Sequence, residues 1–284
     1  MPASEIISFN GKIGPASEAG IPPLNRALSL GDGLFETIFW TGKKCLFLKD
    51  HLARLDQGMK TLGFKRERDH LKSLQSQIHA LIAEHSPLAF ARIRLSLFRA
   101  GEGAYLPQSD NCYTLIRFFD LEQDPWDHAA PLTATLVNRI PLQYTAVSSI
   151  KTLSALPYIY AASEAQRRGA EEPVLVDKNG NLAEFGSGNL FIIRDKELLT
   201  PHPFTGCLPG IMRRSIIREA RRMGYRIKLV YLHPDELLPS DTLFFCNVIR
   251  GLRPLALLNT NRIFETQHPI LDQLREKQLQ LRSK

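Results

Sequence analysis

Apolar and polar residues alternate along four segments of the first 120 residues, which is the pattern of β-strands that bury one face. Asn10-Gly11 stands in the middle of the first segment, and this dipeptide favours the tight turn of a hairpin. The second segment is also expected to be a strand pair, which turns near Thr41-Gly42. The four segments are residues 5–14, 33–48, 90–100 and 112–120.

Two helices are expected among these strands. In the first, apolar residues recur at the three- and four-residue spacing of one helix face, with Asp50 as the candidate N-cap and Gly63 as the stop signal. Arg54 lies off this apolar stripe, which consists of Leu52, Leu55, Met59 and Leu62. The second helix is expected over residues 68–84.

The second half of the chain mixes strands and helices in the same way. A hairpin is expected over residues 173–193, where Asn179-Gly180 separates two apolar runs. Strands are expected over residues 132–138 and at the start of 241–255. Helices are expected over residues 157–169 and within 207–224, where a loop leads into the helix and Gly224 ends it.

The segment "DLEQDPWDHAAP", Asp120 to Pro131, separates these halves. It combines acidic residues with two prolines and shows little periodicity, which is typical of a linker. We therefore expect an N-terminal α+β domain over residues 1–120, a linker over 121–131 and a C-terminal α+β domain over 132–284. Hairpins are more evident than strand–helix–strand units, which favours an α+β fold over a doubly wound parallel sheet.

The composition indicates a globular protein without a membrane segment. Of the 284 residues, 44% are hydrophobic and 23% are charged, enough to bury a substantial core. No apolar run approaches about 18 residues, and "MPASEIISFNGK" lacks the basic and apolar regions of a secretion signal. We therefore expect a chain that begins at or near Met1 and stays in the cytosol.

The spacing of the cysteines argues against a metal site, and the charge pattern argues against a nucleic-acid interface. The four cysteines are far apart and form no CxxC or Cys/His cluster, so we expect reduced thiols and no metal site. The net charge of +7 favours anionic ligands. Acidic residues are nevertheless interleaved with basic ones, as in "KRERDHLK", which indicates solvated helix faces and no nucleic-acid interface.

Lys151 is the first candidate for chemistry. It is the one charged residue of "SSIKTLSALP", Ser148 to Pro157, among hydroxyls, small side chains and leucines. An apolar or cationic setting lowers the pKa of an ammonium group, and the free amine can then form a Schiff base with a carbonyl. Taken alone, these residues favour the alternative of an ordinary solvated lysine.

A carboxylate and a helix start offer two further candidates. Glu184 lies in an expected strand with small or apolar neighbours, so it either faces solvent or is buried against a partner that needs its charge, such as a protonated ring nitrogen. The segment "LPGIMRR" opens a helix, and the N–H groups of Ile211 and Met212 could hold a phosphate there. A plain helix start is the alternative.

Three arginines are candidates for binding a carboxylate. Two-residue alternation places Arg92 and Arg94 on one face of a strand, and Arg99 begins the loop that follows. Each has the planar fork that matches a carboxylate, although a surface role is expected for at least two of them. The Gly-Asp-Gly of "RALSLGDGLFET" lacks the spacing of a Walker loop or a dinucleotide fingerprint, so spacing assigns it no chemistry.

Taken together, these segments resemble the class IV aminotransferases, the pyridoxal-phosphate family that includes branched-chain aminotransferase, D-amino-acid aminotransferase and aminodeoxychorismate lyase. The resemblance covers most of the chain and rests on six motifs in family order. They are "RALSLGDGLFET", "HLARL", "SIKTL", "LAEFGSGNLF", "TPHPFTGCLPGIMR" and "FFCNVIRGLRPL".

The resemblance implies a cofactor, a fold and an assembly. Lys151 would carry pyridoxal phosphate as a Schiff base, and Glu184 would pair with the pyridine nitrogen. The phosphate would be held by Arg54, by the backbone of Ile211 and Met212, and by the turn at Asn247 and Val248. The implied fold has two α+β domains with the active site in the cleft between them, in a homodimer whose partner subunit completes the substrate pocket.

The resemblance also implies the substrate class. It is a small molecule with an amino group and a carboxylate, and we expect Phe35, Arg94 and Arg99 to contact it. After the substrate displaces Lys151, the freed amine would act as a base at the substrate Cα. Glu184 would keep the ring nitrogen protonated, so that the ring accepts the electrons left at Cα.

Within the family we expect an aminodeoxychorismate lyase, which releases pyruvate and leaves p-aminobenzoate for folate synthesis. Leu156, five residues beyond Lys151, stands where branched-chain enzymes typically have a tyrosine. An amino-acid transaminase, for branched-chain or D-amino acids, is the alternative. A further alternative is a non-catalytic ligand or nucleic-acid binder on the same scaffold, because Val248 replaces a phosphate-binding hydroxyl and "FRAGEGAY" lacks a second arginine.

Overall fold

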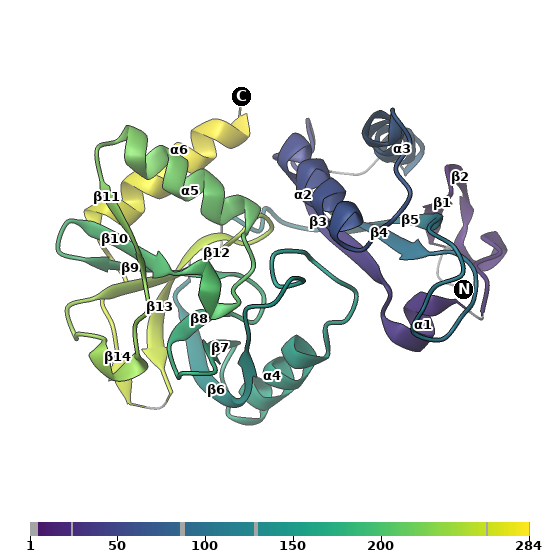
Figure 1. Cartoon of the computed structure of the whole chain (residues 1–284). Helices are drawn as coiled ribbons and strands as arrows, with labels where there is room; N and C mark the ends of the chain where they lie inside the picture. Colours follow the sequence, from purple (N-terminus) through teal and green to yellow (C-terminus); the bar gives the residue numbers. More distant parts are fainter. Residues whose placement is uncertain (1–4, 24, 86–88, 128–129, 260, 284) are drawn as a thin grey trace. The chain divides into compact units, whose positions relative to one another are not determined.

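The computed structural model describes residues 5–23, 25–85, 89–127, 130–259 and 261–283, and these form two compact units (Figure 1). Unit 1 comprises Met1–Asp124 together with Ile150–Ser154, and unit 2 comprises Pro125–Ser149 together with Ala155–Lys284. The boundary after Asp124 falls within the expected linker, of which residues 128–129 lie outside the described residues. The lysine segment belongs to unit 1, whereas the sequence had suggested the C-terminal domain.

Unit 1 is an antiparallel sheet in the order β2-β1-β5-β4-β3. β1 and β2 form the hairpin expected at Asn10-Gly11, and these two residues take positive φ angles of 49° and 80° as the tight turn requires. The strands are β1 (Ile6–Phe9), β2 (Lys12–Pro15), β3 (Gly33–Trp40), β4 (Phe90–Arg99) and β5 (Cys112–Leu121). The helices are the 3₁₀ turn η1 (Ala16–Glu18), α1 (Arg26–Leu30), α2 (Leu48–Thr61) and α3 (His70–His85).

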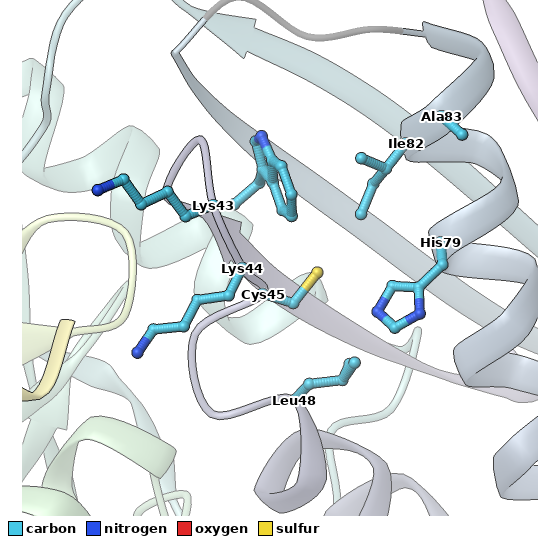
Figure 2. Close-up of a pocket in the computed structure, with 8 residues that line it drawn as sticks. Lys43, Lys44, Cys45, Leu48, His79, Ile82 and Ala83 are labelled. Carbon is cyan, nitrogen blue, oxygen red and sulfur yellow. The ribbon is translucent and has the colours of Figure 1, made fainter. Parts of the chain in front are cut away.

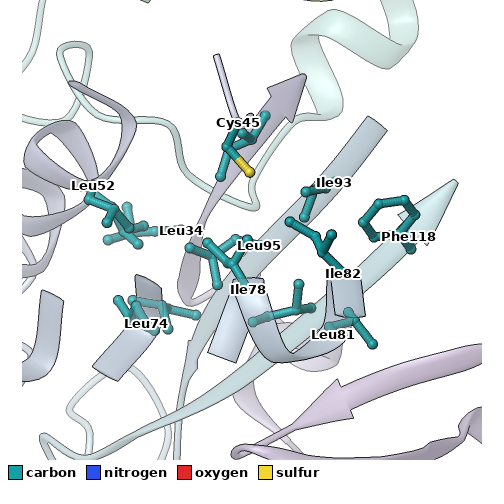
Figure 3. Close-up of a cluster of buried hydrophobic side chains, with 14 of the residues drawn as sticks. Leu34, Cys45, Leu52, Leu74, Ile78, Leu81, Ile82, Ile93, Leu95 and Phe118 are labelled. Carbon is teal, nitrogen blue, oxygen red and sulfur yellow. The ribbon is translucent and has the colours of Figure 1, made fainter. Parts of the chain in front are cut away.

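The core of unit 1 lies between one face of this sheet and the apolar stripes of α2 and α3 (Figure 3). Leu34, Glu36 and Ile38 point to this face, because side chains alternate along β3. Phe35 points to the opposite face. The buried apolar side chains that Figure 3 labels are Leu34, Cys45, Leu52, Leu74, Ile78, Leu81, Ile82, Ile93, Leu95 and Phe118.

Two local expectations for unit 1 were wrong. The expected second strand of residues 33–48 is reduced to a single bridge between Trp40 and Cys45, and β3 pairs along its whole length with β4 instead. α2 begins at Leu48, before the expected cap, since Phe47 takes a left-handed conformation with φ of 54° and turns the chain into the helix. Asp50 therefore lies in the first turn, where a negative charge favours the helix dipole.

Unit 2 is built on a mixed sheet in the order β11-β10-β9-β12-β13-β6-β7-β8, with β14 paired to β13. The hairpin expected over residues 173–193 contains three strands, because the chain turns again at 186–188. The strands are β6 (Leu132–Leu142), β7 (Glu172–Asp177), β8 (Leu182–Phe185), β9 (Asn189–Arg194), β10 (Glu197–Pro201), β11 (Arg226–Val230), β12 (Thr242–Asn247), β13 (Gly251–Leu258) and β14 (Arg262–Ile263).

The helices of unit 2 pack on this sheet. α4 contacts β6 and β7, while α5 contacts β11, β12 and α6. The helices are α4 (Leu156–Arg167), α5 (Ile211–Arg222), α6 (Pro269–Ser283) and the 3₁₀ turns η2 (Pro203–Thr205) and η3 (Pro234–Glu236). The antiparallel sheet of unit 1 and the mixed sheet of unit 2 agree with the predicted α+β class.

Candidate functional site

The lysine segment is bound to the start of β3 in unit 1. The Phe35 N–H donates to the Lys151 carbonyl at 2.9 Å, and the Leu153 N–H donates to the Gly33 carbonyl at 2.9 Å. Gly33 is required for this approach, since a Cβ there would lie 2.5 Å from both a Leu153 methyl carbon and the Leu97 carbonyl oxygen. This contact gives the Gly-Asp-Gly segment a structural role that its spacing did not reveal.

Phe35 contacts two cations on this side of unit 1. The Lys151 Nζ lies 4.4 Å from the centre of the Phe35 ring, and the Arg94 guanidinium carbon lies 3.7 Å from it. Burial lowers the pKa of Arg94, and the neighbouring cations Arg92 and Arg117 lower it further. The structure therefore brings together Lys151, Phe35 and Arg94, in surroundings where an anion would relieve repulsion between the arginines.

Arg99 is in a different position from Arg94. Its side chain is 4% exposed, and its Nε donates to Asp32 at 3.0 Å. The two terminal nitrogens donate to Asp110 at 3.2 Å and to the Leu62 carbonyl at 2.6 Å. Because each of its nitrogens has a protein acceptor, these surroundings count against the predicted contact between Arg99 and the substrate.

Arg54 belongs to a buried cluster with Glu36 and His51. Its Nε and Nη2 donate to the two carboxylate oxygens of Glu36 at 2.7 and 2.6 Å, and the His51 Nδ1 lies 2.7 Å from Glu36 Oε2. Burial raises the pKa of Glu36, but the Arg54 guanidinium and His51 outweigh this and hold the pKa at about 2. The carboxylate is therefore ionised and accepts every one of these hydrogen bonds.

Glu184 is the buried carboxylate of unit 2, near the end of β8. It is 3% exposed, and three neutral groups donate to it: the Tyr158 hydroxyl at 2.8 Å, the Asn189 amide at 3.1 Å and the Leu208 N–H at 3.1 Å. Burial raises the pKa of Tyr158, and the charge of Glu184 raises it further, so the phenol keeps its proton. These donors stabilise the ionised carboxylate, the form that can pair with a protonated ring nitrogen.

Tyr158 and Asn189 were missed by the sequence prediction. Tyr158 is the second residue beyond Leu156 in α4, and Asn189 is five residues beyond Glu184, at the start of β9. The Asn189 amide also donates to the Leu208 carbonyl at 2.8 Å, so it ties Glu184 to the loop before α5. Apolar periodicity carries no signal for contacts of this kind, because the partners come from different elements.

The start of α5 fits the expected phosphate group. Gly210 is the N-cap, and no side chain caps the helix, although Ile211 and Met212 are buried. A Cβ on Gly210 would lie 1.9 Å from Asn189 Oδ1, so only glycine fits at this position. Buried N–H groups at a helix start need an acceptor, and a phosphate supplies one in the favourable end of the helix dipole.

The Asn247 side chain shapes the turn at the end of β12. Its Oδ1 accepts from the N–H groups of Ile249 and Arg250 at 3.0 and 2.7 Å, and its amide donates to the Ser187 carbonyl at 3.0 Å. The Val248 carbonyl accepts from the Trp126 indole at 3.1 Å. The side-chain amide and oxygen of Asn247 and the Val248 carbonyl are thus bound to protein groups, and the phosphate contact at Asn247 and Val248 stays a prediction that concerns their backbone N–H groups.

Unit 1 contains a hollow of about 370 Å³ (Figure 2). It is lined by Trp40, Lys43, Lys44, Cys45, Leu48, His79, Ile82 and Ala83, and none of the residues predicted for the site lines it. Within the described part of the chain, no three His, Cys, Asp or Glu side chains are grouped to hold a metal ion. No helix among the described residues is long and apolar enough to cross a membrane.

Comparison with known proteins gives one consistent family. Residues 33–258 match the sequence pattern described as amino-transferase class IV. The branched-chain-amino-acid aminotransferase of Escherichia coli K12 is 26% identical over 282 residues, which cover 92% of this chain and 87% of that protein. A putative branched-chain-amino-acid aminotransferase of Methanocaldococcus jannaschii is 25% identical, with coverage of 98% and 96%.

Solved structures show the same fold. The branched-chain aminotransferase of Thermoproteus uzoniensis with norvaline superposes with a TM-score of 0.89 at 22% identity and covers 99% of this chain and 96% of that one. The T.th. branched-chain amino acid aminotransferase complexed with N-(5'-phosphopyridoxyl)-L-glutamate gives a TM-score of 0.87 at 22% identity, with coverage of 100% and 96%. The predicted α+β fold is thereby confirmed.

Proposed function

Because the chain belongs to the class IV aminotransferase family, and is accordingly an enzyme that uses pyridoxal phosphate, we propose that it is an amino-acid transaminase for aliphatic substrates. The main support is that branched-chain aminotransferases match 92% and 98% of the chain. These relatives support the transaminase alternative better than the aminodeoxychorismate lyase that the sequence suggested.

Pyridoxal phosphate supplies an electron-accepting ring that stabilises negative charge at the substrate Cα. In our proposal Lys151 would hold the cofactor through its side-chain amine, and the same amine would move the proton at the substrate Cα. The bonds between the lysine segment and β3 fix the Lys151 backbone, which leaves only the side chain to move.

Glu184 holds the proton on the pyridine nitrogen in this proposal. Its support is the set of three neutral donors, Tyr158, Asn189 and the Leu208 N–H, which stabilise the carboxylate without adding positive charge. Arg54, the α5 start at Ile211 and Met212, and the turn at Asn247 and Val248 bind the phosphate. The surroundings described for each half fit these roles, and the predicted cleft between the domains stays a prediction.

Phe35 and Arg94 are our candidates for contacts with the substrate. Phe35 offers an apolar ring beside Lys151, and Arg94 offers a cation whose neighbours Arg92 and Arg117 favour a bound carboxylate. We propose in addition that the enzyme is a homodimer in the cytosol. Sedimentation of the purified protein checks the dimer, and a monomer at all concentrations contradicts it.

Leu156 supports aminodeoxychorismate lyase as the second candidate. It begins α4, five residues beyond Lys151, and its side chain is 69% exposed and has no hydroxyl. A tyrosine at this position is what we expect of a branched-chain enzyme, and this chain has a leucine there.

One experiment separates these functions. The purified enzyme, reconstituted with pyridoxal phosphate, is given L- and D-amino acids with a keto acid acceptor and, separately, aminodeoxychorismate. Exchange of amino groups without release of p-aminobenzoate supports the transaminase, and Lys151→Ala should abolish it together with the visible absorbance of the bound cofactor. Release of p-aminobenzoate with no amino-group exchange would establish the lyase, and turnover of neither supports the non-catalytic binder.

A further inference from the structure

We infer that Glu36 and His51 are positioning residues, which orient the Arg54 guanidinium as a phosphate-binding group. This inference rests on the proposed function, because it assumes that Arg54 binds the cofactor phosphate. The three residues come from two elements of unit 1, since Glu36 lies on β3 while His51 and Arg54 lie on α2. Their contacts therefore fix the helix side chain against the sheet.

The two-point contact between Glu36 and Arg54 sets the direction of the guanidinium. One edge, formed by Nε and Nη2, is bound to both carboxylate oxygens at 2.7 and 2.6 Å. Two parallel hydrogen bonds between planar groups hold both in one plane. The plane and direction of the whole guanidinium are thereby fixed before an anion arrives.

His51 fixes the other partner of this pair. Its Nδ1 lies 2.7 Å from Glu36 Oε2, and both side chains are 1% exposed. Because the carboxylate is ionised and can only accept, the Nδ1 carries the proton. The carboxylate that binds Arg54 is thus itself held by His51. This histidine lies three residues before Arg54 on the same helix.

The surroundings argue against stability as the sole reason for this cluster. Leu34 and Ile38 flank Glu36 on the same face of β3, and both belong to the apolar core. A buried ion pair in such a place stabilises a fold no better than well-packed apolar side chains, because both charges lose their hydration. Holding an arginine in a set direction for a ligand accounts for a charged pair where a leucine pair would fold as well.

The test compares the dissociation constants of pyridoxal phosphate and of pyridoxal, which lacks the phosphate, for the apoprotein. The dissociation constant of pyridoxal divided by that of pyridoxal phosphate measures how much the phosphate contributes to binding. Glu36→Gln should reduce this ratio about ten- to a hundredfold, the range for a hydrogen bond to a charged group, while pyridoxal binding changes less than about twofold. Asp56→Asn is the matched control, because it removes an acid that pairs with Lys60 on the same helix, and it should leave the ratio unchanged.

Two further variants separate orientation from charge and from folding. Arg54→Lys keeps the charge but cannot make the two-point contact, so it should lower the ratio to near the value expected without a phosphate contact. Adding Glu36→Gln to Arg54→Lys should lower the ratio little further. His51→Leu should lower the ratio, and His51→Asn should restore part of it, since its amide can still donate to Glu36. This conservative rescue would not follow if His51 merely filled space.

The outcomes are distinct. If Arg54→Lys and Arg54→Gln keep the full ratio, Arg54 does not bind the phosphate, and this part of the proposed function fails. If those two variants lower the ratio while Glu36→Gln and the His51 variants leave it at the wild-type value, the positioning inference fails and the proposed function stands. If Glu36→Gln proves unfolded in urea denaturation, the Arg54→Lys and His51 series decides the question. Equal loss of pyridoxal and pyridoxal phosphate binding in that series also overturns the inference.

Discussion

Two buried glutamates, one in each unit, are held in opposite ways. Glu36 is paired with a guanidinium and an imidazole, whereas a phenol, an amide and a backbone N–H donate to Glu184. Cations cancel the charge of a carboxylate and fix the cation in turn, while neutral donors stabilise the charge without cancelling it. This difference matches the two roles that we propose, in which Glu36 acts on another side chain and Glu184 acts on the cofactor.

The largest expected effect is on kcat, which substitution of Glu184 should reduce far more than substitution of Glu36. Glu184→Gln should reduce kcat about a hundred- to a thousandfold, as expected when one electrostatic partner of the reacting group is removed. Glu36→Gln, assayed at saturating cofactor, should retain most of kcat. Steady-state kinetics over a range of pyridoxal phosphate concentrations measures both, and an equal loss of kcat in the two variants would remove the distinction.

The next effect concerns pH and stability. The folded-state pKa of Glu36, about 2, lies below the ordinary value of 4.5, so its contribution to stability is complete above about pH 4.5 and is lost as pH falls toward 2. Between these limits the free energy of unfolding of the wild type should fall by on the order of 3 kcal/mol more than that of Glu36→Gln. Urea denaturation at several pH values measures this, and parallel curves would contradict the assigned charge.

The smallest effect sharpens the description of Glu184. Tyr158→Phe removes one neutral donor and keeps the ring, so it should cost about 1–3 kcal/mol of stability. Asn189→Ala should cost a similar amount, because the amide also binds the Leu208 carbonyl. Thermal unfolding measures both variants, with Ser163→Ala on the exposed side of α4 as control. Full stability in both variants would show that these donors do not hold the carboxylate.

The sequence predicted the elements of unit 1 where one pattern dominates. The alternation in β4 and β5 located both strands closely, because each has one face in the core. The start of α2 was misplaced, because the left-handed turn at Phe47 has no compositional signal. The lysine segment was assigned to the wrong side of the boundary for a similar reason, since its bonds to Gly33 and Phe35 join residues more than a hundred positions apart.

The sequence predicted some residues of the candidate site and missed others. The local sequence offered Lys151 and Glu184 only as candidates, and they and Arg54 were given roles because six motifs occur in the order of a known family. Glu36 and Tyr158 were missed, since a single charge in an apolar strand or a tyrosine in a helix gains its meaning only from partners on other elements. Arg99 was named for its fork, and the structure shows this fork bound to protein groups, which sequence spacing did not indicate.

Because Ile150–Ser154 belongs to unit 1, this unit can complete its folding only after these residues have been synthesised. A ribosome that has completed Asp124 has not yet supplied the residues that bind the Phe35 N–H and the Gly33 carbonyl. The whole of Pro125–Ser149, which belongs to the other unit, must emerge before the first unit can be finished. A fragment that ends at Asp124 would therefore lack its last backbone partners, and the lysine to which we assign the chemistry is among the residues that complete unit 1.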